Sequence, residues 1–143
     1  MNIDSIKNGI VIDHIKAKNG LQIYKALNLK DLDCQVAIIT NAKSNKMGKK
    51  DIIKIDKEIN VNLDILGFID PNITINIVKN DKIIKKFHVT KPKKIVNLVK
   101  CQNPRCITSQ EKDLDQIFIL TDEEKQIYRC KYCEMKMQTN QRS

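Results

Sequence analysis

The sequence predicts a chain of the α+β class: an antiparallel sheet domain covered on one face by two helices, followed by a small β-rich domain built around four cysteines. Three observations lead to this prediction. Over the first two thirds of the chain, runs rich in Val and Ile alternate with segments whose apolar residues are at helical spacing. A polar stretch that contains a proline follows. Near the end of the chain, four cysteines form two close pairs. A length of 143 residues allows one ordinary domain or two small ones.

The first part of the sheet domain is predicted to form a strand, a helix and two further strands. Residues 9–15 (GIVIDHI) are an apolar run typical of a strand, and residues 19–29 place three leucines and a tyrosine at roughly helical spacing. Residues 34–40 and 51–56 are strand-like and are expected to pair. The polar loop between them, residues 41–50, is expected to be too long for a tight hairpin.

The second part repeats the pattern of helix and strand. Residues 60–69 show a short apolar pattern compatible with a helix that ends before Pro71, because a residue that precedes proline disfavours the helical conformation. Residues 72–78 alternate like a half-buried strand, and an Asn-Asp turn leads into another strand at residues 82–89. The order βαββαβ with an extra hairpin strand predicts a ferredoxin-like sheet with two helices on one face.

The polar stretch TKPKK, residues 90–94, marks the expected domain boundary. We therefore expect the sheet domain at residues 1–92 and the four-cysteine domain at residues 93–143. The N-terminus lacks a basic segment followed by an apolar one, and no run approaches the ~18 apolar residues that cross a bilayer. A soluble, cytoplasmic chain without a membrane partner is expected.

The last part of the chain carries two cysteine pairs in the pattern C-x4-C…C-x2-C, namely Cys101, Cys106, Cys130 and Cys133. Two pairs at chelating separation, joined by a loop, are what a tetrahedral thiolate site requires. Four unligated thiols or two disulfides are the alternatives, although the reducing cytosol favours metal binding. Residues 117–120 and 126–128 are expected to pair as strands beneath the site. The pattern predicts one structural Zn²⁺ per chain.

The predicted zinc ion is a scaffold, because four thiolates leave no open position for water. So short a segment cannot bury enough apolar area to fold securely alone. Structural zinc contributes on the order of 10–16 kcal/mol in model peptides, so removing the ion should unfold this domain. The fifth cysteine, Cys34, lies in the apolar run CQVAIIT and is expected to be a small buried hydrophobe.

The net charge of +9 is confined to the part before the first cysteine pair. Residues 1–100 hold 19 Lys and Arg against 10 Asp and Glu, whereas residues 101–143 hold seven of each. A solvated basic face, nucleic-acid binding and binding of a small anion are the open interpretations. The neutral four-cysteine segment and the scarcity of aromatic residues count against nucleic acid. A zinc-ribbon protein that binds nucleic acid is therefore kept as the alternative.

A small anionic ligand suits the lysines of the sheet domain better. Lys50 and Lys54 are four residues apart on one strand and are expected to face the same side. Asp13 can accept hydrogen bonds from a ribose hydroxyl, whereas His14 and Lys86 can donate to phosphate oxygens. A structural histidine and a surface lysine are the alternative interpretations of these two residues. The chain shows no nucleophile motif, P-loop or GxGxxG, so it is not expected to be an enzyme.

Four segments together resemble the regulatory chain family of aspartate carbamoyltransferase: IKNGIVIDHI at 6–15, MGKKDIIKI at 47–55, TINIV at 74–78, and the C-x4-C…CKYC ending. The resemblance spans nearly the whole chain. It implies a non-catalytic allosteric subunit that binds ATP, CTP or UTP in its ferredoxin-like domain and pairs through that domain as a homodimer. It also implies a zinc domain that contacts the catalytic chains, and a place in de novo pyrimidine biosynthesis.

The resemblance also implies a set of nucleotide-binding residues. Around the base and sugar it places Ile3, Asp4, Ser5, Ile6 and Val11, with Asp13 and Lys54 at the ribose or base. It places His14 and Lys86 at the phosphates, Lys50 near the triphosphate or a second nucleotide, and Asn76, Val78 and Ile83 on the base side. Asp81 stands where the family pattern has a tyrosine. Beside the cysteine pairs, the candidates for contact with the catalytic chain are Asn103, Arg105 and Glu134.

Overall fold

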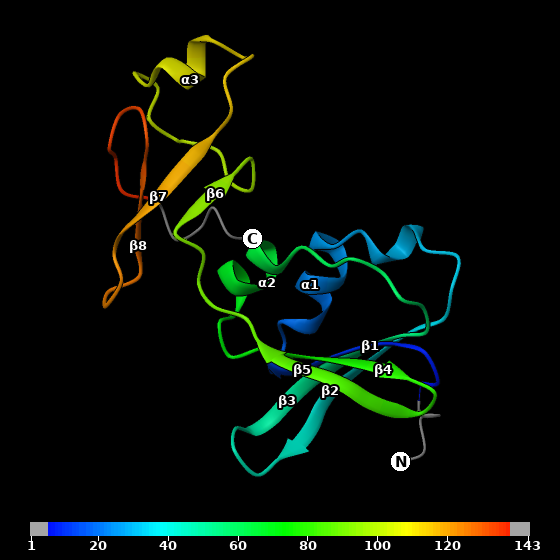
Figure 1. Cartoon of the computed structure of the whole chain (residues 1–143). Helices are drawn as coiled ribbons and strands as arrows, with labels where there is room; N and C mark the ends of the chain where they lie inside the picture. Colours follow the sequence, from blue (N-terminus) through cyan, green and yellow to red (C-terminus); the bar gives the residue numbers. More distant parts are fainter. Residues whose placement is uncertain (1–5, 138–143) are drawn as a thin grey trace. The chain divides into compact units, whose positions relative to one another are not determined.

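The computed structural model describes residues 6–137 and divides the chain into two compact units (Figure 1). The first unit ends at Lys91 and the second begins at Pro92. Within the described residues, no helix has the length and apolar character needed to cross a membrane.

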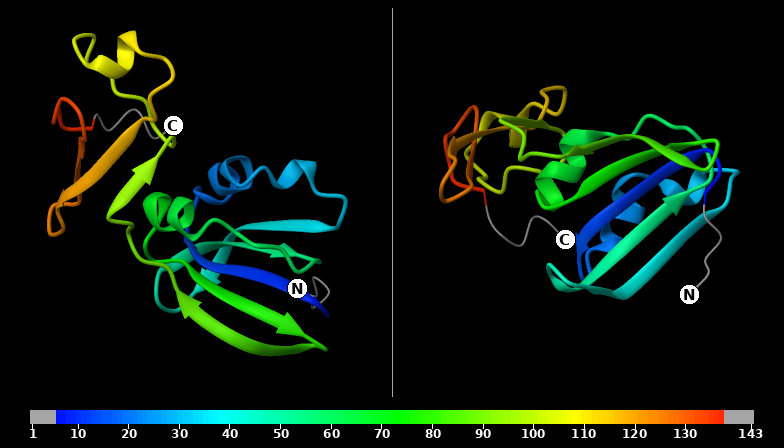
Figure 2. Two further views of the ribbon diagram at one scale, coloured as in Figure 1. Left: turned by 45° about the horizontal axis from the view of Figure 1, so that its top comes forward. Right: turned by 60° about the horizontal axis from the view of Figure 1, so that its bottom comes forward.

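The first unit is built on a five-stranded antiparallel sheet with the strand order β2-β3-β1-β4-β5. The strands are β1 (Gly9–Lys16), β2 (Val36–Ser44), β3 (Gly48–Ile55), β4 (Thr74–Lys79) and β5 (Lys82–His88). One face is covered by the helices α1 (Gly20–Ala26) and α2 (Leu63–Ile69) and the short 3-10 helix η1 (Leu29–Asp31) (Figure 2). The order of the first four strands is that of a ferredoxin-like sheet, so the predicted α+β fold is confirmed.

The hydrophobic core of this unit lies between the helices and the sheet. Every second residue of the central strands points into it, as in a half-buried sheet. Its buried members include Ile10, Ile12, Ile23, Ile53, Ile55, Leu66 and Ile75. Each such side chain stabilises the fold by about 1.5–3 kcal/mol when it leaves water. The intervening residues of the same strands face the uncovered side of the sheet.

The hairpin between β2 and β3 is tighter than expected. The ladder continues to the pair Ser44 and Gly48, so only residues 45–47 form the loop. Gly48 has a φ of +80°, and the Met47 N–H donates to Ser44 Oγ at 3.1 Å. Three-residue hairpin loops commonly end in such a left-handed residue. The expectation of a long polar loop is wrong because this end of the hairpin reaches beyond the core, where polar side chains hide the strand pattern.

The second unit contains a three-stranded antiparallel sheet with the order β6-β7-β8. Its elements are β6 (Lys94–Val96), the one-turn helix α3 (Ile107–Gln110), β7 (Ile117–Asp122) and β8 (Ile127–Cys130). Ile95, Phe118 and Tyr128 form its buried centre, and the Tyr128 hydroxyl donates to the Pro92 carbonyl. The pairing of β7 with β8 confirms the two predicted strands. β6 and α3 were not predicted, because β6 begins inside the polar stretch taken for a linker.

Candidate functional sites: the four-thiol centre and the uncovered sheet face

The four cysteine side chains of the second unit converge on one point. All four Sγ atoms lie within 4.8 Å of one another. The Sγ atoms are 3.6 Å apart between Cys101 and Cys133, and 3.7 Å apart between Cys106 and Cys130. None of these cysteines forms a disulfide, in which the sulfurs would be about 2.05 Å apart. Four thiolates about 2.3 Å from one tetrahedral ion are about 3.8 Å from each other, so these separations suit a single metal ion.

The first cysteine pair is held by a turn that begins at Asn103. The Asn103 carbonyl accepts from the Cys106 N–H at 3.0 Å, and its side-chain oxygen accepts from the Arg105 N–H at 3.0 Å. The Thr108 hydroxyl donates to Cys106 Sγ at 3.1 Å. A hydrogen bond of this kind stabilises a thiolate and fixes its direction, as partners of metal ligands commonly do.

The second pair is held by the turn that follows β8. The Cys130 carbonyl accepts from the Glu134 N–H at 2.9 Å, and the Cys130 N–H donates to the Met135 carbonyl at 3.0 Å. Glu134 has a φ of +63°, a conformation in which the chain reverses directly after Cys133. Both turns therefore present their two sulfurs to the same space.

The thiols of this centre differ in acidity. Burial raises the pKa of the Cys101 thiol to about 12, and burial also raises the pKa of the Cys130 thiol. Burial acts in the same direction on Cys133, but hydrogen bonds from the Asn103 side chain and the Met135 backbone outweigh it and lower the pKa to about 7. Without a cation, Cys101 and Cys130 therefore keep their protons at neutral pH. A metal ion that binds here must displace those protons.

The uncovered face of the sheet in the first unit presents a row of residues that crosses all five strands. The register pairs Ala37 with Lys54, Lys54 with Val11, Val11 with Asn76, and Asn76 with Lys86. Residues that are paired in this way share a face of the sheet. Lys54 and Lys86, both predicted for one pocket, therefore lie on the same face, about 14 Å apart across three strand spacings.

A bulge in β1 sets the positions of Asp13 and His14. The register with β3 shifts between Ile12 and Ile15, so that these two residues oppose the single residue Ile52. His14 has a φ of +58°, which is uncommon for a residue with a Cβ. Bulges of this type re-aim side chains and often lie beside functional sites.

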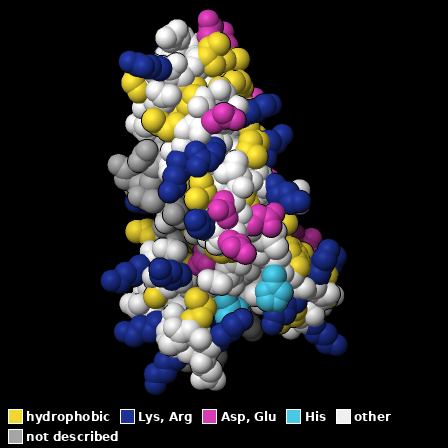
Figure 3. Space-filling view, turned by 90° about the vertical axis from the view of Figure 1, so that its left-hand side faces the viewer, with side chains coloured by type: hydrophobic (Ala, Val, Ile, Leu, Met, Phe, Trp, Pro, Cys, Tyr) yellow, Lys and Arg dark blue, Asp and Glu magenta, His cyan; other side chains and the backbone are white. Residues whose placement is uncertain are grey.

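The bulge brings three of the predicted residues into contact. Lys50 Nζ lies 2.9 Å from Asp13 Oδ1, and the same oxygen accepts from the His14 N–H at 2.6 Å. His14 Nδ1 is hydrogen-bonded to Thr74 Oγ1 at 2.8 Å, and Thr74 pairs with His88 on the next strand. Figure 3 shows both histidines on one face, with lysine side chains close to them. This part of the face therefore combines cationic groups, imidazoles and one carboxylate.

Asn76, on β4 in the same row, has an unsatisfied polar atom. Its side chain is only 8% exposed, and its Oδ1 has no hydrogen-bond partner among the described residues. Leaving a buried acceptor unpaired costs about 1–3 kcal/mol. A ligand with a hydrogen-bond donor would remove this cost.

The remaining residues predicted for the nucleotide site or the partner contact lie outside the described residues, in the first unit or in the second unit. Ile3, Asp4 and Ser5 lie outside the described residues. Ile6 is buried just before β1, and Val78 is buried opposite Ile83, whose side chain is 62% exposed. Asp81, with a φ of +65°, occupies the turn between β4 and β5. In the second unit, Arg105 and Glu134 are exposed beside the thiols and Asn103 is half-buried.

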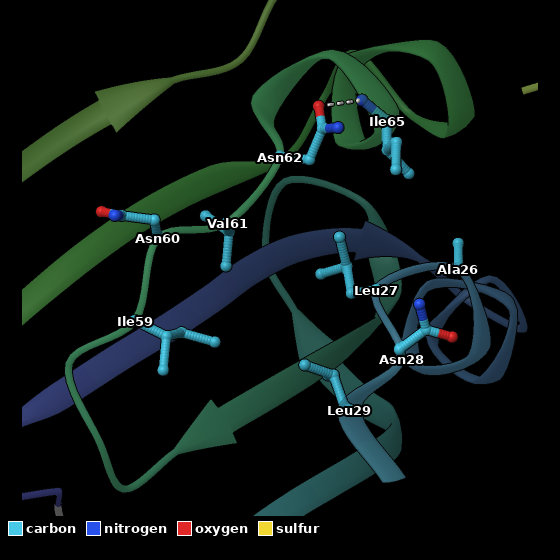
Figure 4. A pocket seen from close by; sticks show the side chains of 9 residues that line it. All are labelled: Ala26, Leu27, Asn28, Leu29, Ile59, Asn60, Val61, Asn62 and Ile65. Atoms are coloured by element: carbon cyan, nitrogen blue, oxygen red, sulfur yellow. Dashed lines mark hydrogen bonds between the residues drawn. The ribbon is translucent and has the colours of Figure 1, made fainter. Parts of the chain in front are cut away.

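A separate pocket of about 210 Å³ lies between the end of α1 and the loop that leads into α2 (Figure 4). The described residues that line it are apolar apart from three asparagines, and none of them is a lysine, arginine or histidine. Asn62 already caps α2 by accepting from the N–H groups of Asp64 and Ile65. Because it has no cationic group, this pocket does not suit a phosphorylated ligand.

Two family models account for most of the sequence. The model of the aspartate carbamoyltransferase regulatory chain, allosteric domain, matches residues 1–90. The model of the same chain's metal binding domain matches residues 93–142.

The chain belongs to the aspartate carbamoyltransferase regulatory chain family.

Curated relatives of this regulatory chain agree with the two matches. The aspartate carbamoyltransferase regulatory chain of Clostridium botulinum strain Hall is 53% identical over 134 residues, which are 94% of this chain and 92% of the relative. That of Clostridium tetani is 53% identical over 135 residues, 94% of each chain. That of Bifidobacterium longum is 40% identical over 134 residues, 94% of this chain and 96% of the relative. The family resemblance predicted from the four segments is thereby confirmed.

One notable residue of this regulatory chain was missed from the sequence. Asp51 is fully buried in β3, where its carboxylate accepts three backbone N–H groups, from Lys18, Gly20 and Asn41. A signal for it was present, because the alternation that buries Ile53 also directs Asp51 to the covered face. A charged residue at a buried position of a strand is uncommon unless it has partners.

Proposed function

We propose that this regulatory chain binds nucleoside triphosphates on the uncovered face of its first unit and uses its second unit to contact catalytic chains of aspartate carbamoyltransferase. Nucleotide occupancy would then control those catalytic chains allosterically, in the cytoplasm, as part of de novo pyrimidine biosynthesis. The observation that carries the proposal is the contact of Lys50, Asp13 and His14 on the same face as the Asn76 oxygen, which has no partner in the described part of the chain.

Each group on this face has a role in the proposed complex. His14 and Lys86 bind the phosphates, and Lys50 exchanges its bond to Asp13 for the triphosphate or a second nucleotide. Asp13 and Lys54 then contact the ribose or base, and Asn76 accepts a hydrogen bond from the base side. Lys54 and Lys86 lie on β3 and β5, so a ligand that contacts both is elongated. Around the base and sugar, the proposed residues are Ile3, Asp4, Ser5, Ile6 and Val11, with Val78 and Ile83 on the base side.

The proposed metal of the second unit is Zn²⁺, one ion per chain, ligated by Cys101, Cys106, Cys130 and Cys133. Four sulfur ligands at these separations favour zinc or an iron–sulfur cluster over the hard cations, and zinc suits a closed tetrahedral site without redox chemistry. The ion would join the two turns that carry the thiols. Its proposed role is to stabilise the second unit.

The surface beside the thiols is the proposed contact with the catalytic chains, through Asn103, Arg105 and Glu134. Three apolar side chains close to them in sequence are well exposed, namely Ile107, Tyr132 and Met135. Exposed apolar and aromatic groups mixed with Arg are typical of protein interfaces. This supports a protein partner for the second unit.

The first unit is proposed to pair with a second copy of the chain. Among the described residues, nothing pairs with the outer edges of the edge strands β2 and β5 of its sheet. β5 carries lysines that protect it, whereas residues 36–40 of β2 (VAIIT) carry no charge. An edge strand without charges is the one that accepts a partner strand.

Calorimetric titration of the zinc-loaded chain with ATP, CTP and UTP tests the effector site. Saturable binding of at least one nucleotide is expected, with loss of affinity in Lys86→Ala. Lys94→Ala, a lysine of the second unit, is the matched control. Absence of binding at millimolar nucleotide would contradict the proposal, and tight salt-sensitive binding of a nucleic-acid oligonucleotide would favour the nucleic-acid alternative.

A further inference from the structure

We propose that Asp51, whose buried carboxylate lies on the opposite side of the sheet from the uncovered face, is a positioning residue for Asp13, His14 and Lys50. The inference rests on the nucleotide-binding function proposed above. Asp51 alternates along β3 with Lys50, so the two side chains point to opposite sides of the sheet. Asp51 therefore cannot contact a ligand on the uncovered face, and any effect that it has there is indirect.

Within residues 6–137, the hydrogen bonds to the Asp51 carboxylate all come from backbone donors. Its Oδ1 accepts from the Asn41 N–H at 3.0 Å, and its Oδ2 accepts from the N–H groups of Lys18 and Gly20 at 3.0 and 2.9 Å. None of the ion pairs in the described part of the chain includes Asp51. A buried charge needs such partners, so these three bonds are strong and directional.

Two of the three donors belong to residues with a positive φ, a conformation that lysine rarely adopts and that asparagine adopts more readily. Asn41 has a φ of +57° and lies in a bulge of β2, directly opposite Asp51. Lys18 has a φ of +83° in the turn that follows β1, which the Asn19 N–H closes onto the Lys16 carbonyl at 2.9 Å. Residues with a Cβ rarely adopt such angles without compensation. The bonds to Asp51 provide that compensation at both places.

These two places flank the effector residues. The β2 bulge opposes Asp51 on one side of β3, and on the other side Asp51 pairs with Ile15, the residue that follows the Asp13–His14 bulge. Lys50 is the neighbour of Asp51 along β3. A strand whose register slips by one residue turns each side chain to the other face. By fixing the register on both sides of β3, Asp51 keeps Lys50 on the face where it meets Asp13.

A purely structural Asp51 would affect stability only. A positioning Asp51 would also affect the affinity of the folded protein for a triphosphate. The two roles are separated by measuring affinity at a temperature where circular dichroism shows each variant to be fully folded. Inorganic tripolyphosphate, titrated beside ATP, reports on the phosphate-binding groups without the base.

The test variant is Asp51→Asn in the full, zinc-loaded chain. Asparagine keeps the size of the side chain but turns an NH₂ group toward at least one of the three N–H donors. We expect its affinity for ATP and for tripolyphosphate to fall about tenfold, as it would if only about a tenth of the folded molecules kept the binding arrangement of Asp13, His14 and Lys50. Leu66→Ala removes a buried side chain of α2 and is the stability control, with lower thermal stability and unchanged affinity expected.

A second pair of variants keeps the test decisive if Asp51→Asn does not fold. Asn41 is exposed, so substitutions there alter the bulge without removing core contacts. Asn41→Val disfavours the positive φ and should lower the affinity for both ligands, whereas Asn41→Gly tolerates it and should bind like the wild type. Wild-type affinity in both Asp51→Asn and Asn41→Val would overturn this inference and leave the proposed nucleotide-binding function standing. A wild-type chain that binds neither ligand would overturn the proposed function and the inference with it.

Discussion

Asn76 is buried and its Oδ1 has no hydrogen-bond partner among residues 6–137, so the residue is expected to lower the stability of the sheet while it serves the proposed binding function. Asn76→Leu replaces the amide with an apolar group of similar size. We expect the free energy of unfolding to rise by about 1 kcal/mol, because no polar atom is then left unsatisfied, while nucleotide affinity falls about tenfold. Chemical denaturation and calorimetric titration measure the two effects. Asn60→Leu, at an exposed loop position, should change neither, and unchanged affinity in Asn76→Leu would remove Asn76 from the site.

The thiols predict how zinc binding depends on pH. The raised pKa values of Cys101 and Cys130 mean that these thiols release protons when zinc binds, even at neutral pH. Below a pH of about 7 the Cys133 thiol is protonated as well, so the affinity should fall more steeply as acid is added. Competition with a zinc-sensitive dye between about pH 8 and about pH 5 measures this slope. An affinity that does not change with pH would show that these thiols are not the ligands.

Residue patterns predicted some of these positions and not others. The cysteine spacing identified all members of the four-thiol centre, because chelation by short turns requires that spacing. The contact between Asp13 and Lys50 could not be derived from spacing, because it depends on a bulge. This bulge in β1 depends in turn on the positive φ of His14, which is not a glycine that would have marked a left-handed position.

At the scale of elements, the hairpin of β2 and β3 depends on Gly48. A Cβ built at this glycine meets no atom within 4 Å, so only the φ of +80° restricts the residue. Gly48→Val should lower the free energy of unfolding by about 1–2 kcal/mol, and Gly48→Asn by less, since asparagine tolerates the left-handed region. Urea denaturation compares the two variants. Equal stability of the valine and asparagine variants would contradict this explanation of the turn.

The strands of the core were predicted because burial on one face imposes alternation. β1, β3 and β4 contribute Ile12, Ile53 and Ile75 to the same core, and each reads clearly in the sequence. β6 was missed because only its middle residue, Ile95, is buried, and the two residues directly before Ile95 are lysines. The outer part of the β2–β3 hairpin was missed for the same reason: no core residue lies there to impose a pattern.

At the scale of the whole molecule, the division into two units predicts that metal removal acts locally. Chelation, or treatment with a mercurial reagent, should unfold the second unit and abolish its binding to catalytic chains. The core of the first unit contains none of the four metal-binding thiols, so nucleotide affinity should stay within about twofold of its starting value. Circular dichroism, calorimetry and co-purification with a catalytic chain follow the three quantities, and added zinc should restore the losses. Simultaneous loss of nucleotide binding would show that the units are not independent.

The short connection between the units limits how they can be uncoupled. Val89 is still held by the first unit, through its N–H bond to the Ile73 carbonyl, while Pro92 is held by Tyr128 in the second. The Lys91 Nζ atom also lies 5.5 Å from the ring centroid of Phe68, a residue of the first unit. The free tether is therefore hardly longer than Thr90. Flexible residues inserted after Thr90 would lengthen this connection without disturbing either hydrophobic core. Inserts of different lengths could therefore be used to vary the strength of coupling between the two units in engineered sensors.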